Sequence, residues 1–291
     1  MQLAAGEALA IVGESGCGKS VTARSLLRLL PEPPARVRAE RLSVAGVSVL
    51  DADARGLRAL RGRSVGFVFQ DPMSALNPAM TIGAQIVERL RRHRGMDRRA
   101  AKQEAASLLS QVGIPDAEGR LKAWPHQLSG GQRQRVVIAI ALAADPALLI
   151  ADEPTTALDV TVQAQILTLL DELRRARGMA VLLITHDLGV VAQGVDRVAV
   201  MYAGQVVEQG AVADLFAAPR HPYTAGLLQA VPGSRPGELY AIPGRVPAPR
   251  DFPAHCRFAD RCDRAQSPCR AEQIELSDTG VRCLYPLQEA R

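Results

Sequence analysis

The fold is decided by residues 13–20, which read GESGCGKS and fit the phosphate-loop pattern of a glycine, four further residues and Gly-Lys-Ser. An apolar run at residues 9–12 precedes the loop, and a helix is expected from residue 19 to about residue 30, where prolines terminate it. Glycines let successive backbone N–H groups turn towards phosphate oxygens. The sequence therefore predicts a site for a nucleoside triphosphate, with Lys19 on the β- and γ-phosphates and Ser20 on Mg²⁺. The loop residues expected to line the nucleotide are Gly13, Glu14, Ser15, Gly16, Cys17, Gly18, Lys19 and Ser20.

A second chemical segment is residues 148–153, LLIADE, in which an apolar strand delivers two consecutive carboxylates. Asp152 at the strand end is placed to hold Mg²⁺ through water. Glu153 is the candidate for orienting the attacking water, because the loose transition state of phosphoryl transfer mainly needs positioning and charge neutralisation. Together with the loop, this segment predicts hydrolysis of the terminal phosphate.

The composition is that of an ordinary globular protein, with 47% apolar and 22% charged residues. The longest apolar run, residues 136–144, is too short to cross a bilayer, and the first residues do not resemble a secretory signal, so a cytosolic location is expected. The net charge of +5 permits nucleic-acid contact without requiring it. The arginine-rich stretch 89–99 is interpreted as a solvated helix face or a partner-facing surface, and no nucleic-acid partner is expected.

Short apolar runs alternate with helical patterns along the chain, which predicts an α/β fold with a largely parallel sheet. A half-buried strand is expected at residues 42–50, and the pattern becomes helical from residue 72 to about 127. Ser129 is the expected cap of a long helix that ends near residues 145–146. Further strands are predicted at residues 65–69, 147–151 and 180–185.

Residues 128–132 read LSGGQ, and with Gln70 in VFQDP, Asp159 in TTALD and His186 in ITHD, all in the same order, they resemble a complete ATP-binding cassette. The resemblance implies a RecA-like P-loop ATPase with a helical subdomain. It also implies that two cassettes face each other head to tail, so that each nucleotide lies between one phosphate loop and the opposite LSGGQ segment.

The same resemblance implies a role for each matching residue. His186 contacts the γ-phosphate in its own subunit, and Gln70 joins the metal site to the helical insertion, so that Glu153, His186 and Gln70 are the expected catalytic residues and Ser20, Gln70 and Asp152 the expected Mg²⁺ site. The ATP-contacting set further includes the signature segment and one aspartate: Ser129, Gly130, Gly131, Gln132 and Asp159.

Residues 69–78, FQDPMSALNP, and 221–232, HPYTAGLLQAVP, are similar to segments of the cassettes that power bacterial dipeptide and oligopeptide importers. This resemblance implies an ATPase peripheral to the cytoplasmic face of the plasma membrane. The implied partners are a second ATPase subunit, two permeases and an external substrate-binding protein. Two alternatives stay open, namely import of nickel or another small solute, and a soluble cassette protein acting on nucleic acid or ribosomes. Intact Glu153 and His186 argue against a non-hydrolysing cassette.

The resemblance divides the chain into a RecA-like core at residues 1–71 and 128–232, a helical subdomain at 72–127 and a cysteine-rich extension at 233–291. Cassettes of this kind carry a strand pair and an adenine-stacking aromatic residue before the point where residue 1 lies, and residues 1–12 contain no aromatic side chain. The N-terminal strands are therefore expected to be missing.

Four of the five cysteines, Cys256, Cys262, Cys269 and Cys283, lie in this extension. Their spacing lacks the paired two-residue gaps of a zinc ribbon, and disulfides are not expected in a reducing compartment. The resemblance favours a [4Fe-4S] cluster, with zinc and unliganded thiols as alternatives, and the cluster is expected to be structural or regulatory and to take no part in hydrolysis. Cys17, beside Lys19 and before a helix, is expected to have a lowered thiol pKa.

Overall fold

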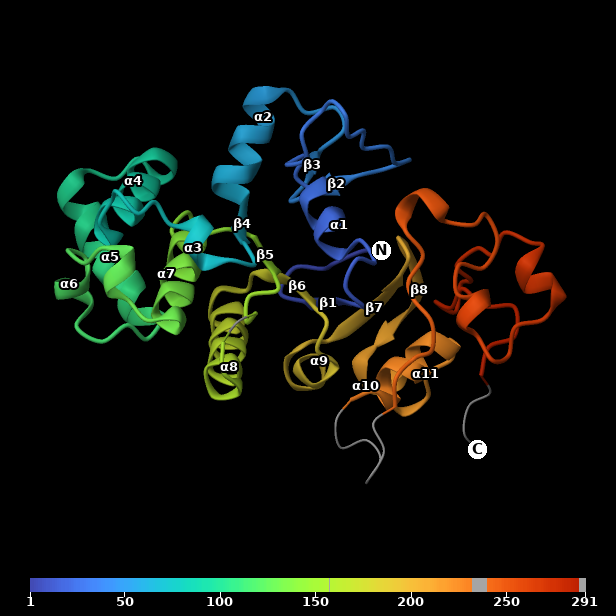
Figure 1. The fold of residues 1–291 in the computed structure, drawn as a ribbon. Helices are drawn as coiled ribbons and strands as arrows, with labels where there is room; N and C mark the ends of the chain where they lie inside the picture. Colours follow the sequence, from blue (N-terminus) through green and yellow to red (C-terminus); the bar gives the residue numbers. More distant parts are fainter. Residues whose placement is uncertain (157, 232–239, 288–291) are drawn as a thin grey trace. The chain divides into compact units, whose positions relative to one another are not determined.

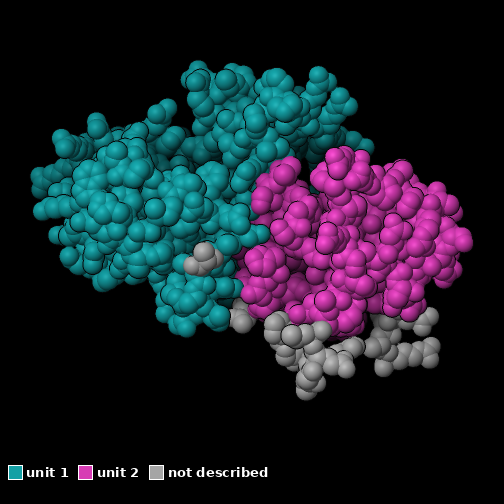
Figure 2. Space-filling model, viewed as in Figure 1, with its two compact units in different colours: residues 1–7, 23–182 teal, residues 8–22, 183–291 magenta. Residues whose placement is uncertain are grey.

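The computed structural model describes residues 1–156, 158–231 and 240–287. The chain forms two compact units, the first from residues 1–7 and 23–182 and the second from residues 8–22 and 183–291 (Figure 2). Of the helices in the described ranges, none combines the length and apolarity that crossing a membrane requires.

The sheet of the first unit has the order β4-β5-β6. Strand β4 (Val65–Val68) pairs in parallel with β5 (Leu148–Asp152), Val65 opposite Leu148. The third strand, β6 (Ala180–Thr185), belongs to the first unit up to Leu182 and to the second from Leu183. These strands are nearly continuous apolar runs because parallel strands are covered on both faces. The predicted parallel α/β core is confirmed.

Helices occupy the segment between β4 and β5, as the sequence pattern predicts (Figure 1). Helix α4 packs against α5, and both contact α7. Their buried positions, including Ile82, Ile86 and Leu90 of α4, recur at helical spacing and form one face. The elements are α3 (Pro72–Ala75), α4 (Ile82–Arg94), α5 (Arg98–Gln111), α6 (Ala117–Arg120), the 3₁₀ turn η2 (Pro125–Gln127) and α7 (Gly130–Leu142). Helix α8 (Val160–Arg177) follows β5.

Two expectations for the N-terminal part are wrong. Helix α1 (Lys19–Ser25) ends well before the prolines, because the next residues form turns in which Arg28 has a left-handed φ of 48°. The strand expected at 42–50 is instead a hairpin of β2 (Ser43–Val44) and β3 (Val47–Ser48), because Ala45 and Gly46 both adopt positive φ and turn the chain back. The segment then continues through α2 (Ala54–Ala59) and the π-helical turn η1 (Leu60–Ser64).

The sheet of the second unit has the order β6-β1-β7-β8. Strand β1 (Ala8–Val12) runs parallel to β7 (Arg197–Tyr202), which pairs antiparallel with β8 (Gln205–Ala211) through a tight turn at Ala203 and Gly204. Its helices are α9 (Leu188–Gly194), α10 (Val212–Ala217) and α11 (Pro222–Gln229). The core of this unit contains residues of β1 and β7, among them Tyr202, together with Tyr223 of α11 and Phe258 of the extension.

The described part of the extension, residues 240–287, is irregular apart from the 3₁₀ turns η3 (Pro249–Asp251), η4 (Ala259–Arg261) and η5 (Ser267–Arg270). It lies along β8: the Arg282 N–H donates to the Val207 oxygen, and Glu208 and Val281 form an antiparallel bridge. The extension thereby covers the edge of the sheet. The boundary predicted at residues 232 and 233 lies outside the described residues, and the domain limits stay predictions.

Candidate functional site

The phosphate loop lies in the second unit between β1 and α1, as its motif requires. Gly16 and Gly18 have φ of 81° and 102°, a region that disfavours other residues. At Gly13 an added Cβ would collide with the Met201 carbonyl oxygen of β7. These glycines allow a tight concave backbone of the kind that binds phosphate, so the loop fits a nucleotide. Ser15 and Gly16 are exposed at its surface.

Lys19 is buried, and its ammonium group contacts the loop itself. Nζ donates to the carbonyl oxygens of Gly13 at 2.8 Å and Glu14 at 3.1 Å. The charge is therefore held at the first turn of the loop, beside the position expected for phosphate.

The expectation for Cys17 is wrong. Its side chain is fully buried, and burial raises the thiol pKa even though Lys19, with Nζ 3.9 Å from Sγ, acts to lower it. Loss of hydration of the thiolate exceeds the attraction of one ammonium group. Spacing along the chain revealed the neighbouring charge but gave no measure of burial.

The two consecutive carboxylates follow β5 in the first unit and have different environments. Asp152 is fully buried, with Arg24 Nη2 3.9 Å from its Oδ2. Glu153 has a left-handed φ of 47°, and its Oε2 accepts hydrogen bonds from Gln70 Nε2 at 3.1 Å and Thr156 Oγ1 at 3.0 Å. A non-glycine residue with this φ is strained, and such strain is found at functional sites. The structure thus brings Gln70 to the carboxylate of Glu153, which lies 83 positions further along the chain and directly follows Asp152.

The LSGGQ segment forms the start of α7, as Ser129 predicts. Ser129 Oγ accepts from the Gln132 N–H at 3.3 Å, and Gln132 Oε1 accepts from the Ser129 N–H at 3.0 Å, a reciprocal capping box. Ser129 and Gly130 are exposed. At Gly131 an added Cβ would lie 2.8 Å from Val162 Cγ1 of α8, so a glycine is required where the two helices meet.

The remaining two site candidates lie at helix starts. Asp159 is the N-cap of α8, and its Oδ1 accepts from the Val162 N–H at 2.9 Å. His186 is an exposed residue directly after β6, and Asp187 next to it caps α9. Both side chains are on the surface of their own units, Asp159 in the first and His186 in the second.

The four extension cysteines line one cavity of about 20 Å³, room for little more than a water molecule, with apolar neighbours such as Ile274 and Leu284. Burial raises the pKa of Cys256 and Cys262 and raises that of Cys283 to about 11, so these thiols stay protonated at neutral pH. Across the described residues, no group of three or more His, Cys, Asp or Glu side chains is arranged to hold a metal ion. The geometry gives the predicted iron–sulfur cluster no support.

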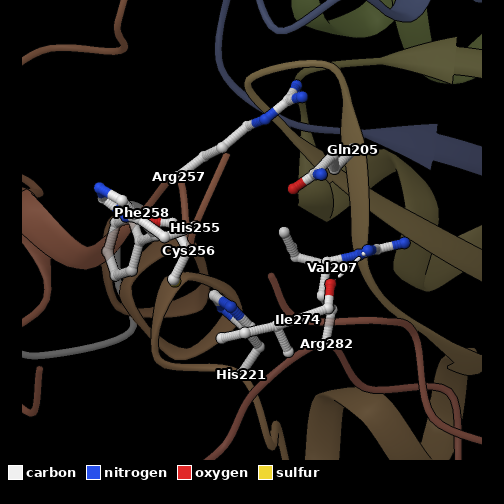
Figure 3. Close-up of a pocket in the computed structure, with 9 residues that line it drawn as sticks. All are labelled: Gln205, Val207, His221, His255, Cys256, Arg257, Phe258, Ile274 and Arg282. Atoms are coloured by element: carbon white, nitrogen blue, oxygen red, sulfur yellow. Dashed lines mark hydrogen bonds between the residues drawn. The ribbon is translucent and has the colours of Figure 1, made fainter. Parts of the chain in front are cut away.

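A neighbouring small cavity is lined by residues of β8, the start of α11 and the extension (Figure 3). His221 on its wall is 2% exposed, and burial lowers its pKa to about 3, so the ring is neutral at physiological pH. Its Nδ1 accepts from the Tyr223 N–H at 3.1 Å and caps α11. The histidine in the HPYT stretch therefore fixes Tyr223.

Sequence reasoning missed two side chains that contact the phosphate loop. The Tyr223 hydroxyl accepts from the Glu14 N–H at 2.9 Å, and the Arg261 guanidinium forms an ion pair with the Glu14 carboxylate at 2.7 Å. Arg261 lies 247 positions from Glu14, and neither Tyr223 nor Arg261 belongs to a phosphate-binding motif. No sequence signal connects them, although both are in stretches already singled out.

A phosphate loop after a parallel strand, a buried aspartate followed by a glutamate, and an LSGGQ helix start define an ATPase of the cassette class. The family model described as ABC transporter matches residues 1–156, and the chain belongs to this family. A second model, described as the C-terminal region of oligopeptide and dipeptide transporters, matches residues 207–269.

Curated relatives match along nearly the whole chain. The dipeptide transport ATP-binding protein DppD of Haemophilus influenzae is 48% identical over 99% of this chain and 88% of the relative. DppD of Bacillus subtilis is 52% identical over 91% of this chain and 79% of the relative. Among solved structures, a dimeric post-hydrolysis state of the cassette MJ0796 bound to ADP and Pi has a TM-score of 0.64 at 30% identity, covering 73% of this chain and 88% of that one. CbiO1 from Clostridium perfringens, also at 0.64 and 30%, covers 75% of this chain and 82% of that one.

Proposed function

We propose that this chain is the ATP-hydrolysing subunit of a bacterial importer that takes up dipeptides or oligopeptides through partner permeases. The observation that carries the proposal is the similarity, over nearly the whole chain, to dipeptide transport ATP-binding proteins. The match at residues 207–269 adds to it, because this stretch includes the HPYT segment whose Tyr223 contacts the phosphate loop.

In the proposed reaction, the loop residues 13–20 hold the phosphates, and Lys19 and Ser20 contact the β- and γ-phosphates and the metal. Ser20, Gln70 and Asp152 are the residues that would hold Mg²⁺, and the ion would supply neutralisation of charge on the phosphate oxygens. Glu153 accepts a hydrogen bond from the attacking water and orients it towards the γ-phosphorus. The water oxygen bonds to the γ-phosphorus while the bond from that phosphorus to the bridging oxygen breaks, the proton lost by the water leaves with the phosphate or to solvent, and ADP and phosphate depart. The hydrogen bonds from Gln70 and Thr156 support this role by fixing the Glu153 carboxylate.

The proposal includes a second cassette. Ser129, Gly130, Gly131 and Gln132 of one subunit would contact the nucleotide bound to the loop of the other, while Asp159 and His186 act near the phosphates. The exposure of Ser129 and Gly130 at the start of α7 supports this arrangement. The further partners are two permeases and an external substrate-binding protein, with the chain peripheral to the cytoplasmic face of the membrane.

The test uses a strain that depends on dipeptides for one required amino acid and carries Glu153→Gln in this chain. Growth on the dipeptide should stop, while growth on the free amino acid and nickel accumulation stay unchanged. Continued growth on dipeptides would disprove the peptide assignment. A selective loss of nickel accumulation would favour the nickel alternative.

The iron–sulfur cluster stays a prediction, and no step of the proposed reaction involves it. Protein purified without oxygen should be brown and contain iron if the four cysteines bind a cluster. Colourless protein with stoichiometric zinc would replace the cluster with a zinc site, and metal-free protein would leave the thiols unliganded.

A further inference from the structure

Glu14 connects the two ends of the phosphate loop through both its backbone and its side chain. Its carbonyl oxygen accepts from Lys19 Nζ at 3.1 Å and from the Cys17 N–H at 3.3 Å. Its own N–H donates to the Tyr223 hydroxyl at 2.9 Å. A shift of Glu14 would therefore displace Lys19, the first residue of α1, and the turn at Cys17 that precedes it.

The carboxylate of Glu14 is held by Arg261 in a bidentate pair. Nη1 donates to Oε2 at 2.7 Å, and Nη2 donates to Oε1 at 3.0 Å. This fork-to-fork geometry fixes orientation as well as charge. The Arg261 side chain is only 5% exposed and Glu14 is 31% exposed, so solvent screens the pair weakly at the arginine end.

Arg261 is itself fixed from every side. Nε donates to the Pro243 oxygen at 2.7 Å, Nη2 to the Ile242 oxygen at 3.2 Å, and Nη1 to the Tyr202 hydroxyl at 3.4 Å, so all five N–H groups have acceptors when the Glu14 bonds are included. Burial alone would lower the pKa of Arg261, but the hydrogen bonds and charge of Glu14 and the bonds to Tyr202 raise it above its ordinary value.

Three buried aromatic rings form the support beneath the arginine. The rings of Tyr202 and Tyr223 lie 4.7 Å apart between centroids, and that of Phe258 lies 5.2 Å and 5.4 Å from them. The guanidinium carbon of Arg261 is 5.6 Å from the Tyr202 ring centre. The contacts between the rings, and between the guanidinium and the rings, stabilise this arrangement beyond the burial of apolar surface and restrict the position of the Arg261 side chain.

The ion pair between Arg261 and Glu14 affects the electrostatic environment of a bound phosphate. Glu14 carries a negative charge at the opening of a loop that binds a polyanion, and an unpaired carboxylate there would repel the phosphates. Arg261 pairs with this charge and fixes the carboxylate by two hydrogen bonds.

We propose that Arg261, at the end of η4 and directly before Cys262, is a positioning residue for nucleotide binding, so that the cysteine-rich extension completes the phosphate site. The inference rests on the proposed ATP site. Arg261 acts through Glu14 and contacts no nucleotide in this scheme. The extension would then support the loop structurally, without itself taking part in hydrolysis.

The test measures binding of the non-hydrolysable analogue AMP-PNP with Mg²⁺ to the full chain by calorimetry, together with thermal unfolding. Arg261→Gln should weaken binding roughly tenfold or more, because the loop is displaced and Glu14 is left unpaired. Adding Glu14→Gln to that variant should recover most of the loss, since the repelling charge is removed. Arg261→Lys, which keeps the charge and loses the fork, should fall between Arg261→Gln and the unaltered chain.

The matched control is Arg282→Gln. Arg282 is also in the extension and donates to the Val206 and Ile274 oxygens, with no contact to the loop. This variant should melt earlier and bind the analogue as tightly as the unaltered chain. In steady-state kinetics Arg261→Gln should raise KM for ATP, whereas a smaller folded fraction would lower only the apparent kcat.

Equal affinity of Arg261→Gln and the unaltered chain would overturn the inference. So would a loss that Glu14→Gln does not recover and that matches the loss of thermal stability, because the arginine would then be only structural. Should Arg261→Gln not fold, equal affinity of Arg261→Lys would overturn it as well. The proposed ATP site fails separately, if the unaltered chain does not bind the analogue and Lys19→Ala changes nothing.

Discussion

The phosphate loop in the second unit and the hydrolytic segment after β5 in the first unit are built differently. Around the loop, Lys19 and Cys17 are buried, and the extension and α11 hold Glu14 by three hydrogen bonds. Around the hydrolytic segment, Gln70 is exposed and Glu153 is half-buried in a strained conformation. The phosphate loop is therefore the more buried of these two regions, and the segment after β5 is the more exposed.

The largest expected effect is on ATP turnover, and it distinguishes the segment after β5 from the phosphate loop. Glu153→Gln should lower ATP turnover by about 10² or more while ATP still binds, because the water loses its orienting carboxylate and the loop is untouched. Lys19→Ala should instead weaken nucleotide binding. Phosphate release and calorimetric titration measure the two quantities. Near-normal turnover by Glu153→Gln would remove Glu153 from the mechanism.

The second prediction tests the surroundings of the phosphate loop by pH. The pKa of His221 is lowered to about 3 in the folded chain from 6.5, so the unfolded chain binds the extra proton between these values and folding is favoured less as pH falls. The full stability is present only well above pH 6.5, where His221 is neutral in the unfolded chain too. The free energy of unfolding should fall by about 1.6 kcal/mol between pH 6.5 and pH 5, with a slope that approaches roughly 1.4 kcal/mol per pH unit at the lower end.

Urea unfolding at several pH values, followed with a probe in the second unit, measures this fall. His221→Asn keeps an acceptor for the Tyr223 N–H and cannot be protonated in this range, so its stability should depend less on pH. An unchanged pH dependence in that variant would assign the effect to other groups.

A smaller effect is expected at Gly131 in the first unit. Gly131→Ala places a Cβ 2.8 Å from Val162 and should destabilise the start of α7 by about 1–2 kcal/mol. Val162→Ala in the same chain should restore part of this stability, because the facing methyl groups are removed. Chemical unfolding of the two single variants and the double variant tests the coupling, and strictly additive losses would contradict the steric explanation.

The smallest expected effect concerns Cys17 in the loop. Because burial raises its pKa and hides the thiol, iodoacetamide should modify Cys17 slowly at neutral pH with or without Mg-ATP. The comparison is with the same chain unfolded in urea, in which modification should be fast. Rapid labelling of the folded chain, read by peptide mass spectrometry, would show that the loop is less tightly packed than its hydrogen bonds indicate.

Local patterns predicted much of the fold because they report local physics. The alternation of apolar runs and helical stripes located β1, β4, β5 and β6, and Ser129 located the start of α7. The pattern failed where a turn depended on two residues with positive φ, at Ala45 and Gly46, since alanine carries no turn signal. It also failed at the end of α1, where a turn at Arg28 replaced the last part of the expected helix.

The sequence by itself determined the class of chemistry, because the phosphate loop, the two carboxylates and the LSGGQ segment are contiguous motifs whose spacing is required by phosphate geometry. Only the tertiary structure decided which side chains from distant parts of the sequence form hydrogen bonds to the residues of these motifs. The hydrogen bond of Gln70 to Glu153 joins residues 83 positions apart, and that of Arg261 to Glu14 joins residues 247 positions apart. Burial, which sets the pKa of Cys17 and His221, was likewise decided only there, because a side chain loses its water to neighbours that the fold brings from elsewhere in the chain.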